Sequence, residues 1–399
     1  MVISIFKRNI ILMVLCISIC LVFAGAAFGN DQPSMSIKPY GYFKLDGAYD
    51  QNLTSHGNFI MWVNPNSSSS DDEQFNMTAN QSRLGLKANG TGYGEFEVYG
   101  NLELDLYAGI TGASVAENKA MLQLRHAYFS VQNKTFKLLA GQTWDLISPL
   151  NPSTLNYSVL WGCGNTGYRR PQVSLFCTIN AADQTNVEVA AGFFRTIGSD
   201  LTPTVTLTLE DDKDGSDDGT DSGIPSFQGR LDVKHGWNGG GFVRAGFSGL
   251  WGQLKAESIL GESEKYESWG AVGHFMLSLN GGSGISGEAY TGSNLGGYFG
   301  GIVNGNTVEG LDSYGGWASA WVKASSQVKL VAGFGYDNPK DEDISDGTRS
   351  QNTAIFGNIQ YNLVAPVTIG LEVAQWETKY KNGDSTDNLR AQTSFIFKF

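Results

Sequence analysis

The stretch EFEVYGNLELDLYA, residues 95–108, decides the fold class of this 399-residue chain. Apolar side chains such as Phe96, Leu102 and Leu104 stand at every second position, with Glu103 and other polar groups between them. This alternation is typical of a β-strand that is apolar on one face and polar on the other. We therefore predict a strand here whose two faces meet different environments.

The same alternation recurs to the end of the chain, where Phe395, Phe397 and Phe399 oppose Ser394 and Lys398. Short turns and long polar connections alternate between these segments, which gives about sixteen strands. The long connections lie near residues 51–77, 109–118, 143–169, 197–223, 255–265, 293–310, 338–349 and 380–387. An even strand number, with short turns at one end and long loops at the other, is typical of bacterial outer-membrane barrels.

We therefore predict an all-β fold over residues 30–399, a transmembrane antiparallel β-barrel with short periplasmic turns and long extracellular loops. The alternative is a secreted β-sandwich or solenoid, which would not require the alternating loop lengths. The composition fits a barrel, with 51 glycines, 12% aromatic residues and a mean hydropathy of −0.18. In a barrel only every second strand residue meets lipid, so the mean hydropathy stays near zero. A net charge of −12 argues against binding nucleic acid.

Residues 1–29 are typical of a secretory signal peptide. Lys7 and Arg8 precede an apolar stretch over 10–23, and the small residues that follow end in Ala27-Phe28-Gly29, an A-x-A-like cleavage site. The alternative is an uncleaved membrane anchor. With the barrel pattern, the signal predicts the outer membrane of a Gram-negative bacterium.

Two of the four cysteines, Cys16 and Cys20, lie in the predicted signal. Cys163 and Cys177 remain as an even pair in an exported chain, so they form a candidate disulfide. The strand phase nevertheless points Cys177 outward, whereas Cys163 lies in a long loop.

Several motifs resemble those of known outer-membrane barrels. The last strand, RAQTSFIFKF, resembles their terminal signature, which implies that Phe395, Phe397 and Phe399 are recognised by the barrel-assembly machinery. QSRLGLK (81–87) resembles the second strand of porins. LQLRHAYF (122–129), GQTW (141–144) and YRRPQ (168–172) resemble the DcaP-like porins.

This resemblance covers the chain after the signal. It implies a homotrimeric channel for small anionic, dicarboxylate-type solutes. Some members carry a helical coiled coil before the barrel, for which residues 30–35 leave no room here.

A sixteen-strand barrel is too wide for side chains to fill and leaves an aqueous channel. Residues 143–169 are the candidate constriction loop, since they hold two prolines and several aromatic residues. The resemblance implies that this third long loop folds into the pore. The alternative is an ordinary exposed loop.

Arg169 and Arg170 close that loop, and strand phase turns Arg170 and Gln172 toward the lumen. A guanidinium suits a carboxylate, so paired arginines at a constriction would favour anions. Equally, Asp145 or strand carboxylates could neutralise them. The candidate constriction and solute-binding residues are Arg169, Arg170, Gln172, Asp145, Trp144, Arg125, Arg83, Arg230 and Arg244.

The sequence contains no nucleophile elbow, metal-binding pattern or phosphate loop. None of the four histidines, at positions 56, 126, 235 and 274, has a local partner motif. We therefore predict a porin rather than an enzyme, without metal or cofactor, whose partners are lipid, lipopolysaccharide and small hydrophilic solutes. A barrel lipase or protease and a non-conducting structural or adhesin barrel are the alternatives.

Overall fold

The computed structural model describes residues 34–65, 73–108, 120–199, 201, 215–257 and 263–399. The predicted signal sequence, 1–29, lies outside the described residues. Within them, no helix is long and apolar enough to cross a membrane.

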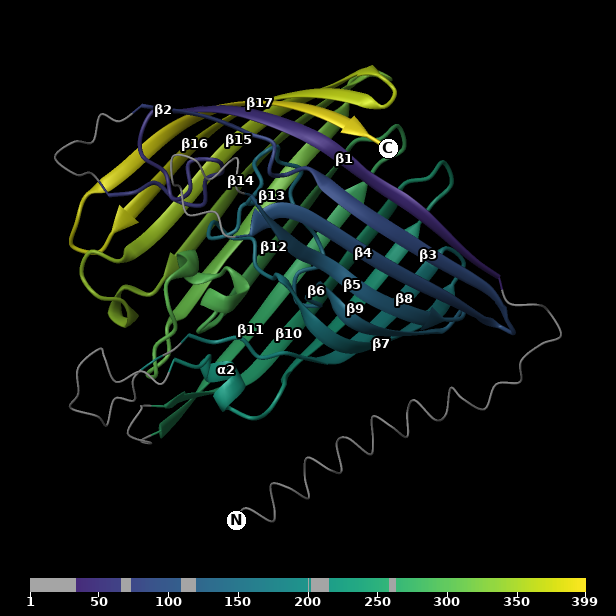
Figure 1. The fold of residues 1–399 in the computed structure, drawn as a ribbon, viewed down its shortest axis with the longest axis horizontal. Helices are drawn as coiled ribbons and strands as arrows, with labels where there is room; N and C mark the ends of the chain where they lie inside the picture. Colours follow the sequence, from purple (N-terminus) through teal and green to yellow (C-terminus); the bar gives the residue numbers. More distant parts are fainter. Residues whose placement is uncertain (1–33, 66–72, 109–119, 200, 202–214, 258–262) are drawn as a thin grey trace, which may run out of the picture.

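The described strands form one closed antiparallel sheet in which the first and last strands pair (Figure 1). Two strands, β2 and β3, pair with successive parts of β1 and share one place in the ring, so the barrel has the sixteen strand positions that the sequence predicts. The strands are β1 (Ser34–Asp50), β2 (Gln74–Thr78), β3 (Arg83–Tyr93), β4 (Phe96–Ala108), β5 (Met121–Gln132), β6 (Phe136–Trp144), β7 (Arg169–Ala182), β8 (Thr185–Phe194), β9 (Ser226–Gly236), β10 (Phe242–Glu257), β11 (Ser263–Ser278), β12 (Gly284–Ser293), β13 (Asp312–Lys323), β14 (Val328–Pro339), β15 (Arg349–Val364), β16 (Val367–Tyr380) and β17 (Ser385–Lys398).

Closure of the ring is made by backbone hydrogen bonds between β1 and β17, in register from Tyr42 opposite Lys398 to Asp50 opposite Arg390. The chain end extends this ladder, because Gly41 and Phe399 exchange backbone hydrogen bonds of 3.1 Å. A closed ring leaves no row of unpaired strand groups at an edge, which is the condition for a sheet to stand in lipid.

The two faces of the sheet differ as the alternation predicts. On β16, Leu371 and Val373 are 52% and 54% exposed on the outside, whereas Glu372 between them is 3% exposed on the inside. Large apolar side chains are exposed in this way on most strands around the barrel. Soluble monomers rarely expose continuous apolar surface on this scale, so the outer face is suited to hydrocarbon.

The connections are short at one end of the barrel, the turn end, where β7 and β8 are joined by residues 183–184 alone. At the other end, the loop end, long connections include residues 51–73, 145–168, 195–225 and 294–311, which we call the first, third, fourth and sixth loops. The connection predicted near 380–387 contains only residues 381–384, because β16 and β17 extend further than the pattern indicates. In the part of the chain that the structure describes, the helical turns lie in the loop-end connections: α2 (Asp218–Asp221), η3 (Gly296–Tyr298), η4 (Gly301–Val303) and η5 (Asp341–Asp343).

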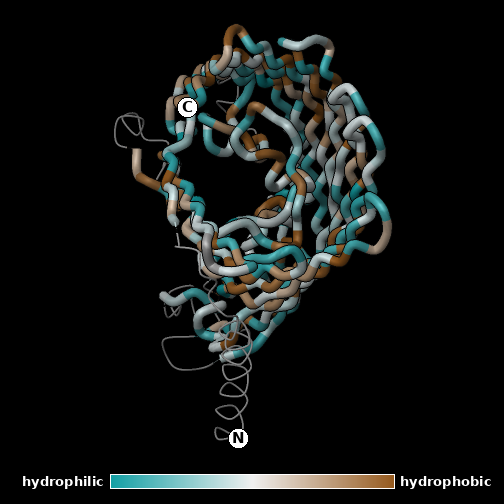
Figure 2. Tube along the Cα trace, turned by 90° about the vertical axis from the view of Figure 1, so that its right-hand side faces the viewer, coloured by the Kyte–Doolittle hydropathy of each residue, from teal (hydrophilic) through white to brown (hydrophobic). Residues whose placement is uncertain are grey.

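Parts of the first, third and sixth loops lie inside the ring of strands, as the view from the turn end shows (Figure 2). Ile60 of the first loop and Leu160 of the third loop are at most 1% exposed, and they pack against the inward side chains of Phe356 and Trp376. The main apolar core therefore lies within the barrel, against the wall formed by β13 to β16. Burial of these side chains draws the loops into the lumen.

We predict that Val373→Lys, on the outward face near the middle of β16, destabilises the barrel by about 2–4 kcal/mol in lipid, because a lysine would have to enter hydrocarbon. Urea unfolding in lipid vesicles measures this. The matched control is Asp384→Lys in the exposed connection between β16 and β17, which we expect to leave stability within about 0.5 kcal/mol. Equal effects of the two lysines would contradict an outward, lipid-facing Val373.

Candidate functional site

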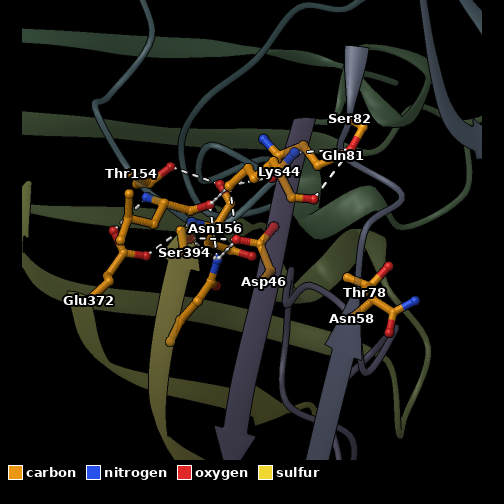
Figure 3. A network of polar contacts seen from close by, with 12 residues as sticks. Lys44, Asp46, Asn58, Thr78, Gln81, Ser82, Thr154, Asn156, Glu372 and Ser394 are labelled. Atoms are coloured by element: carbon orange, nitrogen blue, oxygen red, sulfur yellow. Dashed lines mark hydrogen bonds and ion pairs between the residues drawn. The ribbon is translucent and has the colours of Figure 1, made fainter. Parts of the chain in front are cut away.

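The third loop is fixed inside the barrel by charged groups of the wall (Figure 3). Glu372 on β16 accepts hydrogen bonds from the backbone N–H groups of Leu155 and Asn156, at 2.7 and 3.1 Å. From β1, the Lys44 amine donates to the Leu155 carbonyl at 2.9 Å and lies 3.2 Å from Asp46. A carboxylate that accepts backbone hydrogen bonds away from water fixes the chain more firmly than a neutral acceptor.

Two further carboxylates on the same wall hold other parts of this loop. Glu288 on β12 accepts hydrogen bonds from the Ser148 hydroxyl and from the Leu150 N–H, the latter at 2.9 Å. Asp337 on β14 accepts from the Gly164 N–H at 3.3 Å. Carboxylates on β12, β14 and β16 thus bind three separate parts of the loop.

Arg170 belongs to a closed ionic network. Its guanidinium is fully buried, lies 2.8 Å from Asp145, donates to the Gly297 carbonyl at 2.9 Å and lies 3.8 Å from the centre of the Tyr298 ring. Asp145 also accepts from the Gln228 amide at 2.8 Å. Asp145 therefore neutralises Arg170, the second of the two roles that the sequence left open. The pair joins β7 to the third and sixth loops and offers no free charge to a solute.

Arg169 has the opposite surroundings. It is 3% exposed, and none of its three guanidinium nitrogens has a hydrogen-bond partner among the residues that the structure describes. Its guanidinium carbon lies 5.0, 4.5 and 6.0 Å from the ring centres of Trp144, Tyr168 and Trp161. Cation–π contacts offset part of the desolvation, but aromatic faces do not neutralise a charge. Arg169 therefore makes this part of the inner layer electropositive.

A cavity of about 240 Å³ lies beside these rings, where the first, third and sixth loops meet. Its polar groups are few and mutually bonded: Tyr157 donates to Gln123 at 3.0 Å, and Gln123 donates to the Tyr168 hydroxyl at 2.7 Å. Burial raises the pKa of Tyr157 to about 12, so the phenol stays protonated. Burial also lowers the pKa of His56, which favours the neutral imidazole. The cavity is lined by His56, Phe59, Met61, Tyr107, Gln123, Tyr157, Trp161, Tyr168 and Phe299.

Arg125 and Arg83 stand on the wall nearest to this cavity, but both face Glu103. Arg125 donates to Glu103 and Asp105, each at 2.7 Å, and Arg83 lies 3.8 Å from Glu103. A register shift between β4 and β5 turns both Arg125 and His126 inward, which explains why the stretch around them lacks a clear alternation.

Gln172 has a structural role in this arrangement. Its amide donates to the backbone carbonyls of Trp144 and Thr143 at 2.9 and 3.1 Å, and its oxygen accepts from the Ser174 hydroxyl at 2.8 Å. These bonds fix the start of the third loop against β7.

Arg230 and Arg244 are not part of the loop cluster, our name for the parts of the first, third and sixth loops that lie inside the barrel. Arg230 on β9 is at the same level of the sheet as Phe176 on β7, since both pair with the same residue of β8. Phe176 lies six residues from Arg170 along β7, toward the turn end. It lies 2.7 Å from both Glu188 and Asp232, and Arg244 lies 2.8 Å from Asp232. The structure thus divides the predicted site residues into two groups.

The candidate disulfide is not present, since Cys163 and Cys177 are both free. Cys163 is fully buried in the inner layer, with its Sγ 3.7 Å from the Asn352 carbonyl, whereas Cys177 points outward from β7. Burial also raises the pKa of the Cys163 thiol, which favours the unreactive form. The barrel wall therefore keeps the two sulfurs apart.

Sequence reasoning did not find the contributions of the first and sixth loops. Each contains a signal that could have indicated burial: FIMWV at 59–63 and LGGYFGGIV at 295–303 are apolar runs inside otherwise polar connections. Phe299 of the second run stacks on Trp161 with ring centres 4.7 Å apart. An apolar run in a long loop of a barrel predicts a segment that folds inward.

Solved structures with the same fold are outer-membrane channels and porins. The outer membrane channel DcaP of Acinetobacter baumannii is 19% identical, with a TM-score of 0.69 over 92% of this chain and 98% of that chain. The anion-selective porin of Comamonas acidovorans is 11% identical (TM-score 0.55, covering 92% and 100%), and the trimer form of OmpT of Vibrio cholerae is 12% identical (0.56, covering 92% and 100%). No protein family model matches the sequence, and neither does any curated protein. At these identities the likeness establishes the porin-type barrel fold.

We predict that Asp145→Asn destabilises the inner layer by about 3–5 kcal/mol, because it leaves the buried Arg170 without a counter-charge. Limited proteolysis of the third loop and the unfolding midpoint measure the effect. The double variant Asp145→Asn/Arg170→Gln removes both charges and should recover a large part of the loss. A double variant no more stable than Asp145→Asn would show that the ion pair is not the cause.

Proposed function

We propose that the chain is a porin of the outer membrane of a Gram-negative bacterium, which forms a water-filled channel for passive diffusion of small hydrophilic solutes and prefers anions, including those of the dicarboxylate type. The observation that carries the anion preference is Arg169, a buried cation in the inner layer with no carboxylate against it among the described residues. The likeness to an anion-selective porin supports the same preference.

The geometry suggests how the preference arises. The three loops occupy the lumen beside β13 to β16 and narrow the passage. A fixed charge next to a narrow passage acts at short range and in a lowered dielectric, so it influences ions more strongly than a charge on the outer surface. Asp145 cancels the field of Arg170, whereas the field of Arg169 persists.

We propose no catalytic role. His274 has its Nε2 2.6 Å from Asp232, but its Nδ1 has no hydrogen-bond partner among the described residues and therefore no nucleophile to activate. His126 has its Nδ1 3.0 Å from the Thr143 hydroxyl and its Nε2 3.9 Å from Glu103. Glu103 is already paired with Arg125, and the geometry at 3.9 Å is too long for the hydrogen bond that orients a catalytic histidine. The conductance measurement below tests the alternative that the barrel does not conduct.

A homotrimer is part of the proposal, supported by the trimer form of the Vibrio cholerae protein with the same fold. Lipid contact is supported by the outward apolar side chains. Recognition by the barrel-assembly machinery through Phe395, Phe397 and Phe399 stays a prediction, and so does contact with lipopolysaccharide. These phenylalanines all lie on the outer face, between 44% and 49% exposed, where another protein could reach them.

We predict that Arg169→Gln lowers the anion-to-cation permeability ratio about threefold to tenfold, because one unpaired charge at close range is removed. The reversal potential of single channels in a potassium chloride gradient across a planar bilayer measures the ratio. Arg195→Gln, which alters an exposed arginine at the loop end, is the matched control and should leave the ratio unchanged.

Three results would each overturn a different part of the proposal. Absence of stepwise conductance from the wild-type protein would exclude the channel. Cation preference of the wild type would exclude the anion preference. Equal ratios for the wild type and Arg169→Gln would exclude Arg169 as its source.

A further inference from the structure

A second recess opens on the inner wall, nearer the turn end than the loop cluster. Its volume is about 350 Å³, and every side chain that lines it belongs to a strand between β7 and β11. None of these residues belongs to the three inward loops. The recess is lined by Thr178, Asn186, Glu188, Asp232, Lys234, Phe242, Arg244 and Met276.

Asp232 is the centre of the charge network in this recess. Arg244 binds it through two parallel hydrogen bonds of 2.8 and 2.9 Å, Arg230 lies 2.7 Å away, and the His274 Nε2 lies 2.6 Å away. With four nitrogen atoms of three residues around it, the Asp232 carboxylate has little capacity to attract a solute cation. Its role is to hold the arginines in position.

The remaining groups of the recess are mainly hydrogen-bond donors. Lys234 is exposed, its amine lies 4.4 Å from the centre of the Phe242 ring, and it forms no ion pair within the described part of the chain. Arg244 uses Nε and Nη2 for Asp232, which leaves Nη1 outside that pairing. Thr178 and Asn186 add a hydroxyl and an amide. An oxyanion is the ligand that such donors complement.

One acidic group in the recess would repel a bound anion. Glu188 is paired with Arg230 at 2.7 Å, but its side chain is still 30% exposed. Among the lining residues, Lys234 and Arg244 balance Glu188 and Asp232. Arg230, which pairs with both carboxylates from beside the recess, gives the charge network around it one excess positive charge.

We infer that this recess is a second binding station, which holds a small oxyanion (a carboxylate or a phosphate group) on the inner wall between the loop cluster and the turn end. The inference rests on the proposed function, because such a station serves a solute that crosses the lumen. Lys234 and Arg244 would contact the anion, and Asp232 would position Arg244.

The test compares three neutral glutamine variants. Lys234→Gln removes a donor of the recess, Glu188→Gln removes the opposing carboxylate, and Lys87→Gln is the matched control. Lys87 is also an exposed lysine stacked on an aromatic ring, 4.5 Å from the centre of the Tyr40 ring, but it belongs to β3 and lines no part of the recess. If only the overall charge of the lumen mattered, the two lysine variants would behave alike.

Two readouts are used with inorganic phosphate and with malonate as separate probes. Isothermal titration calorimetry on the detergent-solubilised protein measures binding, and block of single-channel current in planar bilayers measures residence in the pore. We expect Lys234→Gln to weaken binding of at least one probe about threefold to tenfold, and Glu188→Gln to strengthen it. Lys87→Gln should change neither readout, and the probe with the larger effect identifies the phosphate or the carboxylate as the better ligand.

The inference is overturned if the wild type binds neither probe, if Lys234→Gln has no more effect than Lys87→Gln, or if Glu188→Gln weakens binding. Failure of the proposed function looks different. A wild type that does not conduct, yet binds a probe in the calorimeter and loses that binding in Lys234→Gln, would refute the porin and leave the station in place.

Discussion

The backbone ladder between β1 and β17 is the constraint on which the rest of the structure depends. It joins the two ends of the sheet over the nine register pairs from Tyr42–Lys398 to Asp50–Arg390. Once the ring is closed, each strand has one face toward the outside and one toward a lumen too wide for its own side chains to fill. The ladder also orders the first loop, because Arg390 pairs with the buried Asp50 at 2.6 Å and donates to the Asn58 carbonyl at 2.9 Å.

The inner wall of the barrel has two regions of different character. Along β12 to β16, inward Phe356 and Trp376 pack with the loops in an apolar core, while Glu288, Asp337 and Glu372 bind backbone and side-chain groups of the third loop. Along β7 to β11, side chains of both charges and hydrogen-bond donors line the inner wall. The third loop reaches this wall too, because Leu146 packs against Phe176 of β7 and Ile147 packs against Leu250 of β10.

The two adjacent arginines show how neighbouring residues of one type acquire different roles. Arg170 is fully buried and bound to Asp145, so its contribution is to stability, and separating the pair would leave a charge without compensation. Arg169 is nearly as buried but faces aromatic rings, and no carboxylate among the described residues neutralises its charge. The same distinction separates Lys234, which forms no ion pair among the described residues, from the arginines that Asp232 holds.

The alternation in residues 95–108 and its recurrence determined the barrel, its strand number and the inward or outward phase of β4, β7 and β16. These follow from the sequence because the side-chain period of a strand is two and each face meets one solvent. The bulge that turns both Arg125 and His126 inward, the absence of the Cys163–Cys177 bond and the pairing of Arg170 but not Arg169 were decided only by the tertiary structure. Each depends on groups far apart in the sequence, such as Asp145 with Gln228 or Trp161 with Phe299, and their proximity arises only when the ring closes and the loops fold into it.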